Sequence, residues 1–160
     1  MNKIELADLF AQEIHSKQDY EKLERTATII AKYTALENKD INEDLIVVAL
    51  LKDVLKVDEF LIEEISNDFS YEQLEAILIL SIEELTLNSI QELSKNKLSS
   101  IVKLAEKIEE LRSNKDMPSF KDYEFINKME LLCIFIGDEF PFLTSQIEAL
   151  IIERKKIIWK

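Results

Sequence analysis

The sequence has 160 residues, of which 47% are apolar and 32% charged, and this composition is typical of a folded globular chain. A chain of this length buries enough surface to form a core without disulfides or a structural metal. It contains only one glycine and two prolines. P-loops, dinucleotide-binding fingerprints and nucleophile elbows each need two or more closely spaced glycines, so enzyme classes built on those motifs are excluded.

The charge balance is strongly acidic, with 20 Lys and Arg against 32 Asp and Glu and a net charge of −12. Nucleic acid repels such a surface, and only three of the cations are arginines, the residue preferred for bidentate phosphate contacts. We therefore expect no nucleic-acid partner, and the lack of a long apolar run predicts no membrane partner. The single cysteine, Cys133, favours a reducing compartment, so we expect a cytoplasmic protein.

Apolar residues recur at three- and four-residue spacing along nearly the whole chain, as in Leu98, Ile101, Val102, Ala105 and Ile108. This pattern predicts an all-α fold, an irregular helical bundle that forms one domain. The predicted domain covers residues 1–160, and its helices are expected, in chain order, at 3–15, 19–36, 42–55, 59–66, 71–82, 87–93, 96–113, 119–137 and 143–158.

Several helix ends carry their own signals. Asn42, Ser70 and Ser119 stand where the side chain of an N-cap residue would accept a hydrogen bond from a free backbone amide. Pro118 and Pro141 interrupt the helical pattern near the last two predicted helices.

Three segments resemble RelA/SpoT-type HD domains, in the same order and register. Ala49-Leu50-Leu51-Lys52-Asp53-Val54 is similar to the family's Ala-Leu-Leu-His-Asp-Val, and Val102-Lys103-Leu104-Ala105-Glu106 to its Val-Lys-Leu-Ala-Asp. Upstream, Ile14-His15-Ser16-Lys17-Gln18 resembles the family's opening motif. The resemblance covers residues 7–113 and implies an HD-like fold related to single-domain (p)ppGpp hydrolases.

The resemblance also indicates where a divalent cation would be held, and this sequence departs from the family there. The HD site uses one histidine, an adjacent His-Asp pair and a later aspartate, so that a metal-bound water attacks phosphorus. Lys52 stands in place of the paired histidine, Asp53 remains, Glu106 replaces the later aspartate, and the first histidine falls on Thr26 or Thr28. Protonated lysine has no lone pair to give, so the resemblance implies a site without metal.

The acid-base positions of the family are also changed. The pair that follows the His-Asp motif corresponds to Lys56 and Val57, and a second pair corresponds to Glu109 and Glu110. We therefore predict no catalytic residues.

Three interpretations of Lys52 remain open. It neutralises Asp53 and Glu106 in a charge cluster that replaces the metal, or forms an exposed ion pair at a helix end, or belongs to a ligand site. Lys103 and Arg112 would bind phosphate in a residual cleft, or are charges on helix surfaces.

The only histidine and the only cysteine carry no chemistry of their own in this interpretation. His15 is expected to be a surface or packing residue, and Cys133 to behave as a small core residue.

The leading hypothesis is a catalytically inactive HD-domain protein that binds a protein partner or a small phosphorylated ligand without a cofactor. One alternative is a diverged phosphohydrolase that uses Asp53 and Glu106 with Mn²⁺ or Mg²⁺. A second alternative is an acidic helical module that docks on a basic partner through faces such as 59–64. Convergence of Lys52, Asp53 and Glu106 in the folded chain would support either HD hypothesis.

Overall fold

The computed structural model describes residues 1–36, 42–82, 84–113 and 119–158, and within these ranges every regular element is a helix. The all-α prediction is confirmed. The elements are α1 (Lys3–Ile14), α2 (Lys17–Leu36), α3 (Asn42–Leu51), α4 (Val54–Val57), α5 (Leu61–Ile65), α6 (Tyr71–Leu80), α7 (Leu87–Ser94), α8 (Lys97–Ser113), α9 (Ser119–Ile136), the 3-10 turn η1 (Gly137–Glu139) and α10 (Pro141–Ile158).

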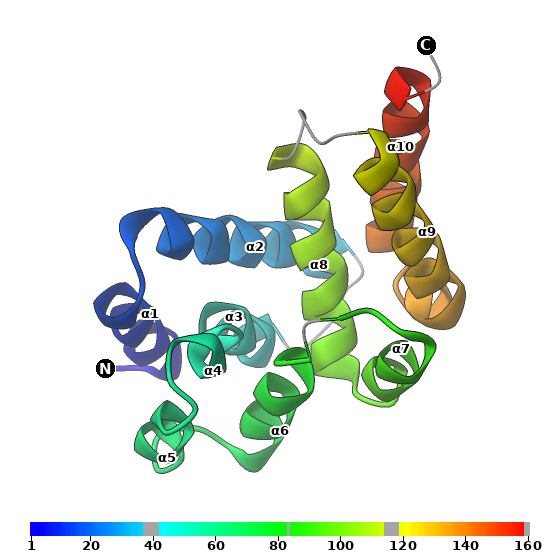
Figure 1. Cartoon of the computed structure of the whole chain (residues 1–160). Coiled ribbons are helices and arrows are strands. Elements are labelled where there is room, and N and C mark those ends of the chain that lie inside the picture. The colour runs from blue at the N-terminus through cyan, green and yellow to red at the C-terminus, as the bar shows by residue number, and fades with distance from the viewer. Residues whose placement is uncertain (37–41, 83, 114–118, 159–160) are drawn as a thin grey trace.

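Helix α8 is the central element of the fold (Figure 1). It packs against α2 and α3 on one side and α9 and α10 on the other, and also contacts α6 and α7. Because neighbours cover it on several sides, its buried residues follow one another almost without interruption from Ser99 to Glu109. Charged side chains of α8 are therefore held inside the molecule, which is unusual for a helix of a globular protein.

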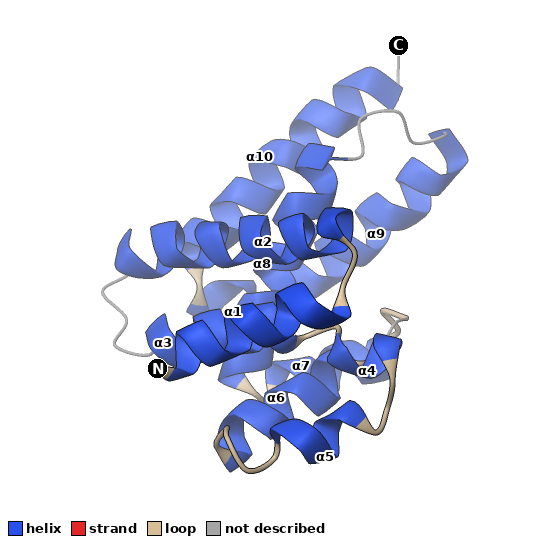
Figure 2. Cartoon of the chain, turned by 90° about the vertical axis from the view of Figure 1, so that its left-hand side faces the viewer, coloured by secondary structure: helices blue, strands red, loops and turns tan. Residues whose placement is uncertain are grey.

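Helix α3 brings a second apolar segment against this centre. Leu45, Val47, Val48, Ala49 and Leu51 are all fully buried, because α3 is covered by α1, α2, α6 and α8. A view turned by 90° shows α1 and α2 lying across this part of the molecule (Figure 2). The end of α3 consequently points its last residues toward the middle of α8.

The predicted helix 42–55 is wrong in one respect, because it is interrupted. Helix α3 ends at Leu51 and α4 begins at Val54. Between them Asp53 has φ −101° and ψ 9°, outside the helical region. Lys52, in the interruption, is buried and forms an ion pair with Glu106 of α8. The other predicted helix ends differ from the observed ones by at most two residues.

The N-cap predicted at Ser70 is confirmed. Its Oγ accepts a hydrogen bond from the Gln73 amide at 3.2 Å, and Gln73 Oε1 accepts one from the Ser70 amide at 2.9 Å. The caps predicted at Asn42 and Ser119 lie outside the described side chains, and Pro118 lies outside the described residues.

Pro141 begins a helix rather than interrupting one. It occupies the first position of α10, where the fixed φ of proline suits a helix and its missing N–H leaves no bond unmade.

One further property concerns membranes. Among the helices of the described ranges, none is long and apolar enough to cross a bilayer.

Candidate functional site

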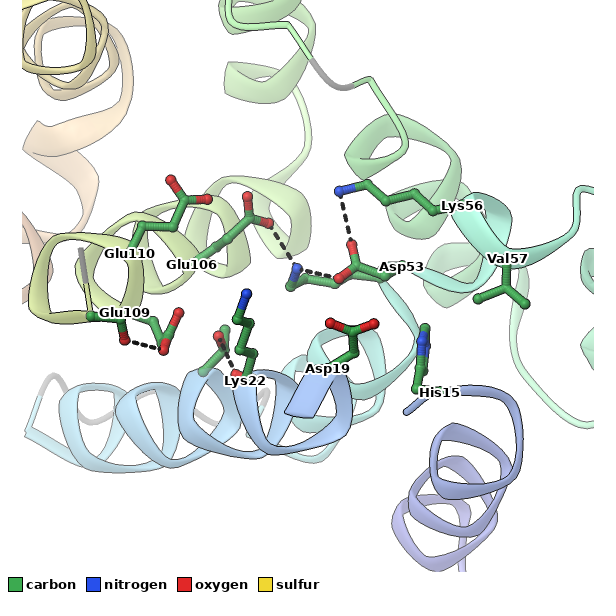
Figure 3. A pocket seen from close by; sticks show the side chains of 12 residues that line it. His15, Asp19, Lys22, Asp53, Lys56, Val57, Glu106, Glu109 and Glu110 are labelled. Carbon is green, nitrogen blue, oxygen red and sulfur yellow. Dashed lines mark hydrogen bonds and ion pairs between the residues drawn. The ribbon is translucent and has the colours of Figure 1, made fainter. Parts of the chain in front are cut away.

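A cavity of about 390 Å³ opens where the end of α1, the first turns of α2, the α3–α4 junction and the second half of α8 meet (Figure 3). Such a volume is in the range of small-molecule sites, although its walls are far more polar than most. We call it the charged cavity. It is lined by His15, Asp19, Lys22, Thr26, Lys52, Asp53, Lys56, Val57, Glu106, Glu109, Glu110 and Ser113.

Lys52 forms the centre of the cavity wall. Its Nζ lies 2.9 Å from Asp53 Oδ2 and 3.1 Å from Glu106 Oε2, and its side chain is only 8% exposed. The three residues therefore converge, although they come from the α3–α4 junction and from α8. An exposed ion pair at a helix end does not describe this geometry.

Two more lysines approach the same carboxylate from α8 itself. Lys103 Nζ lies 3.2 Å and Lys107 Nζ 3.6 Å from Glu106 Oε1. Together, Lys52, Asp53, Lys103, Glu106 and Lys107 form what we call the buried charge cluster. Glu106 is thus bordered by three ammonium groups, a set of neighbours that compensates a buried carboxylate well.

The carboxylates at the edge of this cluster are paired as well. Asp53 also forms an ion pair with Lys56, at an N···O distance of 3.3 Å, and Glu110 forms one with Lys107 at 3.1 Å. Glu109, on the α2 side, accepts hydrogen bonds from Arg25 Nε at 2.9 Å and from the Ser113 hydroxyl at 2.6 Å. Most of the negative charge in the cavity wall is therefore already neutralised.

These neighbours shift the ionisation of the central groups. Burial alone would lower the pKa of Lys52, but the charges of Glu106 and Asp53 outweigh it and hold that pKa above its ordinary value. Burial alone would raise the pKa of Glu106, yet Lys52, Lys103 and Lys107 outweigh it and hold that pKa well below its usual range. Both groups remain charged at neutral pH.

Two members of the site are less well compensated. Burial lowers the pKa of Lys103 and outweighs the charge of Glu106, its one ion-pair partner among the described residues. Burial also raises the pKa of the Glu110 carboxyl. Within the cluster, neighbouring charges therefore compensate the burial of Lys52 and Glu106 well and that of Lys103 poorly.

Charge around the cavity is nearly balanced, although the protein as a whole is acidic, because cations behind the wall pair with the carboxylates that line it. Six cationic side chains, counting the paired Arg25, Lys103 and Lys107 behind the wall, face five carboxylates. The chain as a whole has a net charge of −12.

The rim of the cavity carries side chains that remain available. Figure 3 shows Lys22 and Asp19 extending from α2 into the cavity, with His15 beside them. In the described part of the chain, Lys22 forms no ion pair, and the buried His15 Nε2 has no hydrogen-bond partner. Burial lowers the pKa of His15, which keeps the imidazole neutral.

Not every residue singled out by sequence lies at this site. Thr26 lines the cavity, and its hydroxyl donates to the Lys22 carbonyl at 3.0 Å, whereas Thr28 is exposed and lines a separate hollow with Arg112. Lys103 is buried in the cluster, so the expectation of a surface charge is wrong for it. Neither Lys103 nor Arg112 lines the charged cavity.

Sequence reasoning missed Asp19, Lys22, Arg25 and Lys107. The pattern that marks Lys107 is its position four residues after Lys103 on a helix whose apolar residues surround it, but charges at this spacing usually lie on a solvated face. Lys22 and Arg25 carry no comparable signal.

Cys133 lies away from this site. It is partly buried, packs against the core, and burial raises the pKa of its thiol to about 11. The raised pKa keeps the thiol protonated at neutral pH, in keeping with a packing role.

Within the described ranges, no group of three or more His, Cys, Asp or Glu side chains is arranged to hold a metal ion. Comparison with protein-family models found no match, and comparison with curated proteins found no significant similarity. The function is therefore argued from the cavity itself.

Proposed function

We propose that this protein is a catalytically inactive, HD-like binding module whose charged cavity binds a small phosphorylated ligand. The observation that carries the proposal is the double ion pair of Lys52 with Asp53 and Glu106. In the HD resemblance these are the positions of a metal-ligand histidine and two metal-ligand carboxylates. A lysine ammonium thus supplies the positive charge that the cation would supply.

The residues present do not fit a divalent cation at this place. The oxygens of Asp53 and Glu106 already accept hydrogen bonds from Lys52, whose ammonium would repel a second cation. The resemblance places the first histidine at Thr26 or Thr28. Of the two, Thr26 lines the cavity, and a neutral hydroxyl is a poor replacement for imidazole. We therefore favour binding over the alternative of Mn²⁺- or Mg²⁺-dependent hydrolysis.

The chemistry of the remaining groups favours an anion. Lys22 and Lys56 extend ammonium groups from opposite sides of the cavity, and the neutral ring of His15 offers a donor or an acceptor. Because the inner carboxylates are paired, a phosphate at the rim would meet the ammonium groups of Lys22 and Lys56, the second of which also contacts Asp53, beside the carboxylate of Asp19. Guanosine tetraphosphate is the first ligand to test, since the resemblance is to its hydrolases.

Binding is tested by calorimetric titration of guanosine tetraphosphate, GTP and inorganic pyrophosphate into the purified chain. We expect affinity for a phosphorylated ligand to fall about tenfold in Lys22→Ala. The matched control is Lys32→Ala, an exposed lysine on the same helix outside the cavity. Absence of binding, or equal loss in both variants, contradicts the proposal.

Catalysis is tested on the same preparations with Mn²⁺ present. We expect negligible hydrolysis of guanosine tetraphosphate, because Lys56 and Val57 stand at the family's acid-base positions. Turnover that disappears in Asp53→Ala would show instead that the phosphohydrolase alternative is correct.

A further inference from the structure

The outer face of α6 carries apolar side chains that nothing in the described chain covers. Its inner residues, Ala76 and Ile77 among them, pack against the core. On the opposite side, Tyr71 is 74%, Leu78 51% and Ile82, just past the helix end, 39% exposed. Their spacing places them along one side of the helix, with the exposed carboxylate of Glu75 between Tyr71 and Leu78. We call Tyr71, Leu78 and Ile82 the α6 stripe.

Most of the net charge of the protein lies in the segment of the sequence that contains this stripe. Residues 57–94 contain ten of the 32 acidic residues and no Lys, Arg or His, while the rest of the chain has 20 cations against 22 acids. Glu72 and Glu75 are exposed on α6 itself, and Glu63 and Glu64 on the neighbouring α5. Within the described residues, none of these four carboxylates is paired with a cation.

We propose that the α6 stripe and its acidic border form a docking surface for a basic amphipathic helix of a partner protein. The α6 stripe spans three turns, a length suited to side chains repeating at helical spacing on a partner. The unpaired carboxylates favour a partner helix that has lysine and arginine beside its apolar side chains, and they increase the rate at which the two proteins associate.

Charge excludes the other occupants of this surface. A second copy of the chain would bring two anionic borders together, and nucleic acid or an anionic membrane would be repelled in the same way. A basic protein segment gains from both the α6 stripe and the carboxylates.

This surface is separate from the charged cavity. Figures 1 and 2 show α5 and α6 at the end of the molecule opposite the C-terminal part of α10, and no residue of α6 lines the cavity. Docking there does not depend on the ligand proposed above.

The test uses a labelled peptide of about 18 residues, with leucines on one helical face and lysines on the other, measured by fluorescence anisotropy. We expect saturable binding that weakens at least about tenfold in Leu78→Ser and between about 50 and 200 mM salt. The double variant Glu72→Gln/Glu75→Gln should also bind more weakly, with its helix content unchanged by circular dichroism. Ile152→Ser, which removes a side chain 56% exposed on α10, should bind as the wild type.

A peptide with the same composition but scattered leucines serves as the second probe. Equal affinity for both peptides would show simple charge attraction and overturn the proposal. Equal loss in Ile152→Ser and Leu78→Ser would overturn it as well. The proposal would also be overturned if duplex DNA or anionic vesicles bound saturably and Leu78→Ser abolished that binding. A dimer detected by sedimentation would overturn it too, if Leu78→Ser dissociated the dimer.

Discussion

Lys52 and Lys103 differ sharply in how well the fold compensates them, although both are buried and both contact Glu106. Lys52 lies between two carboxylates within 3.1 Å, whereas Lys103 contacts one, at 3.2 Å. A buried charge stabilises a fold only when its partners repay the loss of hydration. The opposite directions of their pKa shifts express this difference.

We predict opposite outcomes for the two lysines. Lys52→Met removes the ammonium that joins Asp53 to Glu106 and should lower the free energy of unfolding by about 3 kcal/mol, the low end for a broken buried ion pair, because other lysines still contact both carboxylates. Lys103→Met removes an ammonium that burial penalises and leaves Glu106 with two lysines, so it should cost less than about 1 kcal/mol or stabilise the protein. Urea unfolding monitored by circular dichroism measures both.

The control for this comparison is Lys95→Met. Lys95 pairs with Glu92 at 3.1 Å, but the two side chains are 72% and 56% exposed, so its loss should change stability by less than about 1 kcal/mol. Unfolding of Lys52→Met that coincides with that of Lys95→Met would show that the double ion pair contributes nothing.

The pH dependence of stability follows from the carboxylates of the same cluster. Lysines hold the pKa values of Asp53 and Glu106 below their ordinary values, despite burial. As the pH falls, these carboxyl groups therefore take up protons in the unfolded chain before they do so in the folded one. Their contribution to the free energy of unfolding is complete above about pH 5 and is lost as the pH falls through the folded pKa values. We expect the thermal midpoint of unfolding to decrease as the pH is lowered below about 5. This decrease should be less steep in Lys52→Met.

His15 causes a separate loss of stability, at pH values above those at which the carboxylates titrate. Its pKa is lowered by burial, so protonation favours the unfolded chain as pH falls below about 6.5. His15→Asn should remove the decrease in stability that begins near pH 6.5 and leave the decrease below pH 5 unchanged. An identical slope below pH 5 in Lys52→Met and wild type would contradict the cluster's role.

At this scale, sequence predicts the centre of the site and not its surroundings. The HD resemblance proposed from the sequence names Lys52 and Glu106, and the structure brings the two side chains together. The burial of Lys103 could not be predicted, because a lysine among apolar residues on a helix normally extends its charge to solvent. Only the packing of six helices around α8 encloses it.

Among the helices, the apolar repeat predicts position and length well because most helices pack one side on the core. It fails at the junction of α3 and α4, where the repeat continues through Lys52 but the backbone does not. A local pattern contains no information about the pairing with Glu106, fifty-four residues further along the chain. The apolar repeat therefore reveals neither the interruption nor the ion pair beside it.

The junction of α9, η1 and α10 depends on the single glycine of the chain. A Cβ on Gly137 would lie 2.7 Å from Thr144 Oγ1 and 2.9 Å from its Cγ2. Thr144 has little room to move, because its hydroxyl donates to the Gly137 carbonyl at 2.7 Å. The sequence reveals the glycine, but only the structure shows that α10 approaches it closely.

We predict that Gly137→Ala lowers the free energy of unfolding by about 1–3 kcal/mol through this overlap. Thr144→Ala removes the overlapping atoms and one hydrogen bond, at a cost of about 1 kcal/mol. In the double variant the overlap is absent, so its loss should be smaller than the sum of the two single losses. Additive losses in urea unfolding would show that the contact does not constrain Gly137.

At the scale of the whole molecule, charge is divided between two places. Cations and carboxylates are paired around the charged cavity, while the segment 57–94 contains ten acidic residues and no cation. Exposed charges repel one another through water and salt screens them, whereas a buried cluster is screened much less. Salt therefore acts mainly on the acidic part.

We predict that sodium chloride raises the thermal midpoint by about 2–4 °C between about 10 and 150 mM, as the screening length falls from about 30 to about 8 Å. Relief of repulsion among the carboxylates of 57–94 outweighs the weakening of exposed ion pairs, because that segment contains no cation. Glu72→Gln/Glu75→Gln should lose more of this salt response than Glu5→Gln/Glu13→Gln. Both pairs are exposed, each includes an acid in the first turn of its helix, and both change the net charge equally. An equal response in the two variants would show that net charge alone sets the effect, and a midpoint that falls with salt would show that ion pairs dominate the surface.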